Sequence, residues 1–180
     1  LMRVLRYNGH KIDWVMNITD VDDKTIKKTT GEFGPSASPA ELKKFTAKYT
    51  EAFLQDLGSL NIDKNSIRFI DVSDVIPQIQ EFILELLDKG YAYKATDGST
   101  YFSIEKYQAD FDDYGKLIGE DFIRGKKTGA PVAVDEYEKE NLSDFALWKA
   151  KHEDDGEIFW EHQILDKGRP GWHIECSVIN

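Results

Sequence analysis

Apolar residues recur at helical spacing in the first half of the chain and predict helices there. Asn8-Gly9 would end a first helix over residues 1–7. Ser38-Pro39, with Glu41 three residues after the serine, predicts the start of a long helix that Gly58 ends. The expected apolar stripes are Leu1, Val4 and Leu5 in the first helix, and Leu42, Phe45, Tyr49, Phe53 and Leu57 in the long one.

Two more helices follow from the same kind of pattern. One begins near Lys24, after a run of acidic residues. The other is expected to start with Ser73 or Asp74 as its N-cap and to close at Gly90. Its apolar stripe is Ile76, Ile79, Ile83, Leu86 and Leu87.

Shorter apolar or alternating runs predict strands, and two of them flank Asp97-Gly98 as in a β-hairpin. A helix, a glycine turn and a short buried strand are typical of a parallel α/β sheet. Such sheets place their sites just beyond the carboxyl ends of the strands. The expected strands cover residues 11–16, 91–95, 100–104 and 144–149, with a connector or short strand over 61–70.

Residues 107–140 differ from the rest of the chain. They hold few aliphatic residues and many Asp, Gly and Lys. We interpret them as a loop-rich, partly mobile insertion in which the basic stretch 125–129 is a solvated loop.

A polar cluster follows the first predicted strand and contains Asn17, Thr19, Asp20, Asp22 and Asp23. Thr19 could offer its hydroxyl to a ligand amine or carbonyl, and Asp20 could hold an ammonium or a ring nitrogen. Alternatively, one of the aspartates caps the next helix. We expect at least one to be a cap, but capping does not account for all three together with Asn17.

Residues 168–177 hold the only cysteine, Cys176, which therefore cannot form an internal disulfide. A lone cysteine is either a small buried apolar residue or a reactive or metal-binding thiolate. Trp172, His173 and Glu175 lie within five positions of it. This concentration of functional groups favours a site, with one or two of the side chains facing a cleft.

Other residues add four expectations. Residues 168–171 are expected to form a turn that allows a close approach of backbone. Lys149, at the end of a predicted strand, could meet an anion or simply be solvated. Residues 152–157 are read as an acidic surface loop. Histidines without partners at ligand spacing are read as surface residues, namely His10, His152 and His162.

Composition narrows the function classes. The formal net charge is −10, from 33 Asp plus Glu against 23 Lys plus Arg, which argues against a surface that coats nucleic acid. One cysteine in 180 residues suits a reducing compartment. The sequence contains neither a signal peptide nor an apolar run of the roughly 20 residues that cross a bilayer.

Three stretches resemble signatures of one enzyme family. Residues 17–24, NITDVDDK, resemble the NITD(I/V)DDK signature of cysteinyl-tRNA synthetases. Residues 168–177, GRPGWHIECS, resemble a second signature of that family, and residues 144–149, DFALWK, resemble its DF(A/V)LWK segment. The resemblance covers essentially the whole chain.

The resemblance implies an α/β fold, the Rossmann-like parallel-sheet catalytic domain of a class I aminoacyl-tRNA synthetase. Such an enzyme activates L-cysteine with ATP, as its Mg complex, and transfers it to tRNA(Cys). By position, Cys176 matches a zinc ligand, Trp172 the aromatic floor of the cysteine pocket, and Thr19 a threonine that contacts the amino acid. His173 is carried over as a residue that shapes the substrate site. A cytoplasmic monomer without a membrane partner is expected.

Zinc would explain the choice of substrate. Cysteine and serine are nearly isosteric, so that a pocket built on size alone discriminates weakly. A thiolate is a strong, soft zinc ligand and a hydroxyl is a poor one.

The resemblance also predicts how the chain is divided. Residues 1–90 belong to the Rossmann-like domain, residues 91–140 form a connective insertion with a small α+β fold, and residues 141–180 resume the catalytic domain. Both ends look cut, so the ATP-binding motifs and the other zinc ligands are expected before Leu1 and after Asn180. One ligand does not hold zinc tightly. The isolated chain is therefore expected to be inactive and to bind no stoichiometric zinc.

Two alternatives remain. A cysteine ligase of the mycothiol pathway shares the Trp-His-Ile-Glu-Cys run and uses an amino-sugar acceptor instead of tRNA. A non-catalytic binding module, in which the motifs are relics and the acidic surface meets a protein partner, is the other.

Overall fold

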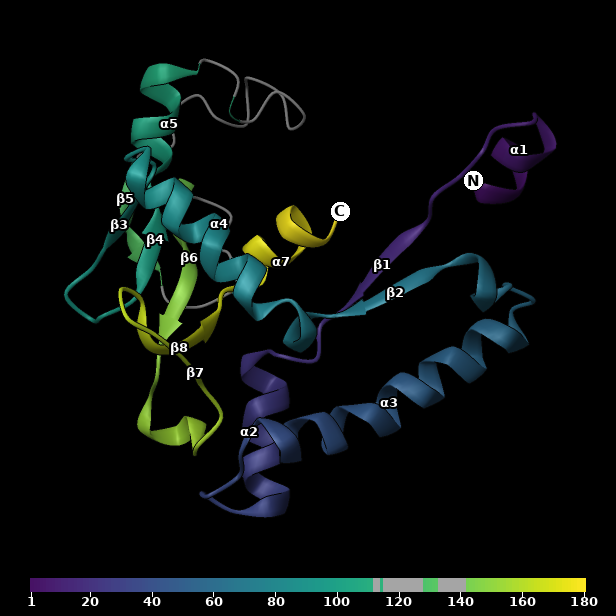
Figure 1. The fold of residues 1–180 in the computed structure, drawn as a ribbon, viewed down its shortest axis with the longest axis horizontal. Coiled ribbons are helices and arrows are strands. Elements are labelled where there is room, and N and C mark those ends of the chain that lie inside the picture. The colour runs from purple at the N-terminus through teal and green to yellow at the C-terminus, as the bar shows by residue number, and fades with distance from the viewer. Residues whose placement is uncertain (112–113, 115–127, 133–141) are drawn as a thin grey trace.

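The computed structural model describes residues 1–111, 114, 128–132 and 142–180, and their elements form two sheets accompanied by helices (Figure 1). The predictions for residues 112–113, 115–127 and 133–141, which include most of the loop-rich stretch 107–140, lie outside the described residues. The helices are Met2–Tyr7 (α1), Asp23–Phe33 (α2), Pro39–Ser59 (α3), Ile76–Asp88 (α4), Ile104–Asp110 (α5) and Trp172–Ile179 (α7), with 3₁₀ turns at Lys64–Ser66 (η1), Val72–Asp74 (η2) and Glu153–Asp155 (η3). The strands are Val15–Ile18 (β1), Arg68–Asp71 (β2), Ala92–Lys94 (β3), Thr100–Phe102 (β4), Thr128–Val132 (β5), Leu142–Ala150 (β6), Trp160–His162 (β7) and Asp166–Pro170 (β8).

The smaller sheet is the parallel pair β1–β2, and α2 and α3 connect its strands. The register runs from Val15 opposite Arg68 to Ile18 opposite Asp71. The predicted strand over residues 11–16 is wrong in its bounds, because the partner strand begins only at Arg68 and pairing therefore begins at Val15. The carboxyl ends of β1 and β2 lie side by side, as a parallel pair requires.

The larger sheet has the strand order β3-β4-β6-β8-β7, with β5 paired to β6. The predicted hairpin around Asp97-Gly98 is confirmed as β3–β4, and the predicted strand over 144–149 lies within β6. Except for the parallel β5–β6 pair, the neighbouring strands of this sheet are antiparallel. The α/β class is confirmed, but in the described part of the chain most strands are antiparallel. The parallel sheet expected from the first half is a single pair.

Residues 168–171 do not form the predicted turn. Residues up to Pro170 belong to β8, which runs beside β6 with Arg169 opposite Lys149. The predicted close approach of backbone is nevertheless present. A Cβ atom added to Gly168 would lie 2.2 Å from the carbonyl oxygen of Lys149, and one added to Gly171 would lie 1.9 Å from that of Ala146.

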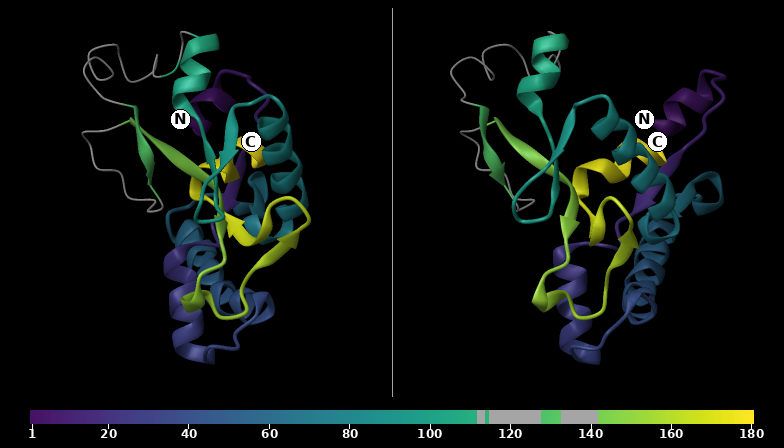
Figure 2. Two further views of the ribbon diagram at one scale, coloured as in Figure 1. Left: turned by 90° about the vertical axis from the view of Figure 1, so that its left-hand side faces the viewer. Right: turned by 60° about the vertical axis from the view of Figure 1, so that its left-hand side comes forward.

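Helix α7 bridges the two sheets, because it contacts both β6 and β1, and α4 packs against it. The core lies around these contacts and includes the fully buried Trp148, Ile79 and Ile83. Figure 2 shows α2 and α3 grouped at one end of the molecule and α5 at the other. Helix α1 projects from the N-terminal end and contributes no buried residue, contrary to its predicted stripe.

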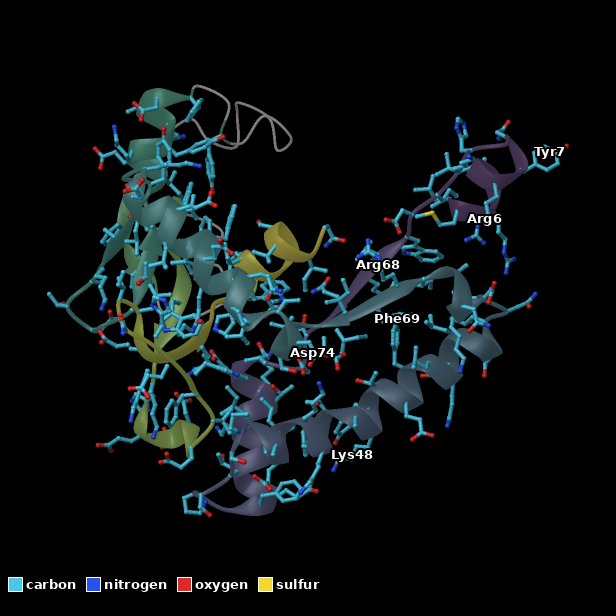
Figure 3. The ribbon with its side chains drawn as sticks, viewed as in Figure 1. Arg6, Tyr7, Lys48, Arg68, Phe69 and Asp74 are labelled. Carbon is cyan, nitrogen blue, oxygen red and sulfur yellow. The ribbon has the colours of Figure 1, made fainter. Side chains whose placement is uncertain are left out.

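Only part of the predicted stripe of α3 is buried. Leu42, Phe45 and Leu57 are buried, but Tyr49 is 55% exposed and Phe53 is 37% exposed. Helix α3 packs on α2 near its start and then runs along β2 (Figure 1). There Phe53 meets the ring of Phe69, which extends from β2 toward α3 (Figure 3), with ring centroids 6.3 Å apart.

Two of the helix starts predicted from local signals agree with the structure, and a third does not. Ser38 and Glu41 form the predicted capping box of α3, and Asp22 caps α2. The prediction that Ser73 or Asp74 caps α4 is wrong, because the N-cap is Val75 and makes no side-chain bond. Ser73 binds Asp20, which lies far away in the sequence, instead of its own helix.

Candidate functional site

Two segments far apart in sequence meet where β1 ends. Thr19 follows β1 directly, and its Oγ1–H donates to Oε2 of Glu175 on α7 at 3.0 Å, across 156 residues of sequence. Asn17 Nδ2 donates to the same Oγ1 at 3.3 Å. The carboxyl end of a parallel strand therefore carries a polar cluster that α7 completes, as the sequence predicted for this edge.

Cys176 lies at this junction and is exposed. Its Sγ–H points to Oδ1 of Asn17 at 3.8 Å. The sulfur therefore faces the side chain two residues before Thr19 rather than Thr19 itself. An exposed thiol beside polar groups remains available to a ligand or a metal, whereas one buried among aliphatic side chains would not be.

Trp172 and His173 occupy the first turn of α7. Trp172 is 48% exposed and lies one turn before Cys176, so that both share a helix face. His173 is half-buried, with its ring 5.0 Å from that of Phe145 on β6 and 5.4 Å from that of Trp172. The structure thus brings Trp172 and Cys176 to an exposed face, while His173 packs partly toward the sheet.

Glu175 makes a contact that was not predicted from the sequence. It is 1% exposed and accepts the hydrogen bond of Thr19. The available signal was helical spacing, because Glu175 precedes the buried Ile179 by four residues and therefore lies on the buried face of α7. A carboxylate on that face requires a polar partner.

Asp20 ties the ends of the two parallel strands together. It is 2% exposed, and its carboxylate accepts from the Ser73 N–H at 3.0 Å and from the Ser73 Oγ–H at 2.5 Å. Burial raises the pKa of Asp20 above its ordinary value, and the bonds from Ser73 offset part of this effect. Asp20 therefore links the backbone next to Thr19 to the segment that follows β2.

The substitution Asp20→Asn should change how stability depends on pH. With a raised pKa in the folded state, the stability contributed by Asp20 is fully present below its ordinary value of 3.8 and is lost as the pH rises through the raised value. Asparagine can accept from the Ser73 N–H and donate to Ser73 Oγ. We expect the variant to lose this pH dependence and to be more stable than the parent at pH 7. Urea unfolding at pH 4 and pH 7 tests this, and a variant less stable at pH 7 contradicts it.

A cavity of about 360 Å³ opens beside Thr19. It is lined by Asn17, Thr19 and Asp20, by aromatic residues of α3 such as Tyr49, and by Lys24 and Lys28 of α2. Its lining contains none of the candidate residues of α7. Thr19 and Asn17 therefore belong to both the cavity lining and the cluster that α7 completes.

A zinc centre needs several His, Cys, Asp or Glu side chains close together. Among the described residues, no group of three or more His, Cys, Asp or Glu is arranged to hold a metal ion. The polar neighbour of Cys176 is an amide oxygen, and zinc sites in proteins use at least three protein ligands. The described residues therefore do not fit a zinc centre by themselves.

Within the part of the chain that the structure describes, no helix is both long and apolar enough to cross a lipid bilayer.

Comparison with known families identifies the class of protein. The profile of the family described as "tRNA synthetases class I (C) catalytic domain" matches residues 1–180. The chain therefore belongs to this family of class I tRNA synthetase catalytic domains, in agreement with the resemblance of its motifs.

The relatives narrow the class further. The chain is 44% identical over 180 residues to the cysteine–tRNA ligase of Koribacter versatilis and covers 33% of that protein. It is 45% identical to the cysteine–tRNA ligase of Chlamydia caviae and 46% identical to that of Solibacter usitatus, with 99% of this chain and 35% of each relative covered. The chain thus spans about a third of the length of the curated relatives it matches.

Proposed function

We propose that the protein to which this chain contributes is a cysteinyl-tRNA synthetase, which activates L-cysteine with ATP and transfers it to tRNA(Cys). The observation that carries the proposal is the junction of Thr19, Glu175 and Cys176. It brings the two signature segments together at the carboxyl end of β1. The relatives named cysteine–tRNA ligase support the same reading.

In this proposal the residues of the junction bind the amino acid. Thr19 contacts the cysteine substrate, and its hydroxyl is oriented by the bonds to Glu175 and Asn17. Trp172 supplies an exposed aromatic surface against which a small side chain could pack, and His173 supports it from the sheet side. No residue of this chain is assigned a role in the chemical step, which would depend on positioning ATP and the substrate carboxylate.

We further propose that Cys176 is one ligand of a zinc ion that selects the substrate thiolate. The remaining ligands would come from parts of the protein outside residues 1–180. ATP would bind as its Mg complex. The same proposal includes a monomeric state, a cytoplasmic location and a division of the chain into residues 1–90, 91–140 and 141–180. The single cysteine supports a reducing compartment. The net charge of −10 argues against a surface that coats nucleic acid in general.

The test is amino-acid-dependent exchange between ATP and pyrophosphate by the full-length protein, followed by charging of tRNA(Cys). We expect exchange with cysteine. The rate of exchange with serine should be lower by a factor of roughly 10³ or more. Exchange without tRNA charging, but with transfer to an amino sugar, would replace the proposal by the mycothiol-type ligase. Absence of any cysteine-dependent exchange would favour the non-catalytic module.

A further inference from the structure

A network of four charged side chains lies next to the junction and joins the two signature segments a second time. Asp23, the first residue of α2, accepts from Arg169 Nη2 at 2.7 Å and from Arg169 Nε at 3.3 Å through Oδ1. Its Oδ2 accepts from Lys149 Nζ at 2.8 Å. Arg169 Nη1 donates to Asp155 in η3. Among the described residues, these bonds therefore connect two cations and two carboxylates from α2, β6, β8 and η3.

The network is shielded from water at three of its four members. Lys149, Asp155 and Arg169 are 6%, 6% and 8% exposed, whereas Asp23 is half-buried. Burial alone would raise the pKa of Asp23, but the bonds and charges of Lys149 and Arg169 hold it below its ordinary value. Buried charges that lose a partner are strongly unfavourable, so the members hold one another in place. Lys149 thus pairs with an anion, the carboxylate of Asp23, which is one of the two alternatives predicted for it.

The geometry of Arg169 is specific. Its planar guanidinium spans two carboxylates at once, with Nε and Nη2 on Asp23 and Nη1 on Asp155. A lysine at the same position would carry the charge but not the fork of donors. The residue therefore sets a distance between elements as well as balancing charge.

The position of the network along the chain suggests its role. Asp23 lies four residues after Thr19, and Arg169 lies three residues before Trp172. The pair thus links the same two segments as the hydrogen bond between Thr19 and Glu175, and Trp172 and His173 lie between the two links along the chain. A second link prevents the segments from pivoting about the first.

We propose that Asp23 and Arg169 are positioning residues that fix Thr19 relative to the first turn of α7. This inference rests on the proposed function, because it assigns the pair to the binding of the amino acid. In this proposal neither residue is assigned a contact with the substrate. Loosening the link is expected to weaken cysteine binding selectively, since a displacement of about 1 Å at a positioned group is enough for a large loss.

The test uses the full-length protein with the substitutions Asp23→Asn and Arg169→Lys. We expect the KM for cysteine in pyrophosphate exchange to rise about tenfold or more, with the KM for ATP changed by less than about twofold. Asp166→Asn is the matched control, because Asp166 pairs with Lys94 at 2.6 Å at the other end of β8 and is well exposed. It should leave both KM values unchanged.

A readout independent of activity comes from the junction itself. With Asn17→Cys as background and zinc removed by a chelator, oxidised glutathione can accept the two electrons released when residues 17 and 176 form a disulfide, and mass spectrometry follows the product. The present side chains approach to 3.8 Å. We expect Asp23→Asn to slow its formation about fivefold or more relative to the Asp166→Asn control. Thermal melting identifies variants that are merely unfolded.

The outcomes separate the two proposals. Folded variants with an unchanged KM for cysteine and an unchanged rate of disulfide formation overturn the positioning role, and so does an equal rise of both KM values. If the parent protein shows no cysteine-dependent exchange, the proposed function fails. The rate of disulfide formation then still decides whether Asp23 and Arg169 position the junction.

Discussion

Replacing Gly171 by alanine is expected to destabilise the protein by about 3 kcal/mol or more, because the added methyl group would collide with backbone. Its Cβ would lie 1.9 Å from the carbonyl oxygen of Ala146 and 2.7 Å from the carbonyl carbon. Gly171 has φ −76° and ψ 154°, which alanine adopts freely, so the effect would come from space and not from backbone conformation. Relief would require β6 or the start of α7 to move.

Gly31→Ala is the matched control. Gly31 lies inside α2, and a Cβ added there meets nothing within 4 Å. Alanine at such a position favours the helix, so we expect an unchanged or higher stability, by about 0.5–1 kcal/mol. Denaturant unfolding of both variants compares them directly. Equal stability of Gly171→Ala and the parent protein would show that the two backbones are not as close as described.

The second large effect is expected from Cys176→Ala in the full-length protein. If Cys176 is a zinc ligand, its loss should lower the affinity for zinc by about 100-fold or more, since even the removal of groups that only support a ligand costs 10–100-fold. The KM for cysteine should rise in parallel. Competition with a chromophoric chelator measures the zinc affinity without reference to activity.

Ser177→Ala is the control for this experiment, because Ser177 is the exposed neighbour of Cys176 on the same helix. It should leave zinc binding unchanged. The 180-residue chain on its own is expected to bind less than one zinc ion. An unchanged zinc affinity in Cys176→Ala, or one full zinc ion held by the isolated chain, would contradict the proposed role of Cys176.

Local signals in the sequence predicted local structure well. The box of Ser38 and Glu41 and the cap by Asp22 depend on residues within one helical turn, and both are present. Ser73 carries an equally good local signal but binds Asp20, which is 53 residues away. A cap prediction compares only neighbours, and it fails where a distant buried carboxylate competes for the same hydroxyl.

Periodicity predicted which face of a helix is apolar but not what covers that face. Tyr49 and Phe53 continue the apolar stripe of α3, yet both are substantially exposed. The reason is that α3 extends past α2 and runs along a sheet of only two strands. The same limit applies to the site. The motifs contained Thr19 and Asn17 as well as Glu175 and Cys176. The contacts between these pairs follow only from the packing of α7 against β1.

The order of strands in the larger sheet has a practical consequence for dissecting the molecule. The hairpin β3–β4 takes its inner neighbour, β6, from the final forty residues. A fragment that stops after residue 111 would leave Tyr101, now 1% exposed, at an open sheet edge. A fragment that starts at residue 142 would leave β6 without its neighbour β4. Complementation of two such pieces, mixed and refolded together, should therefore restore more structure than either piece holds alone.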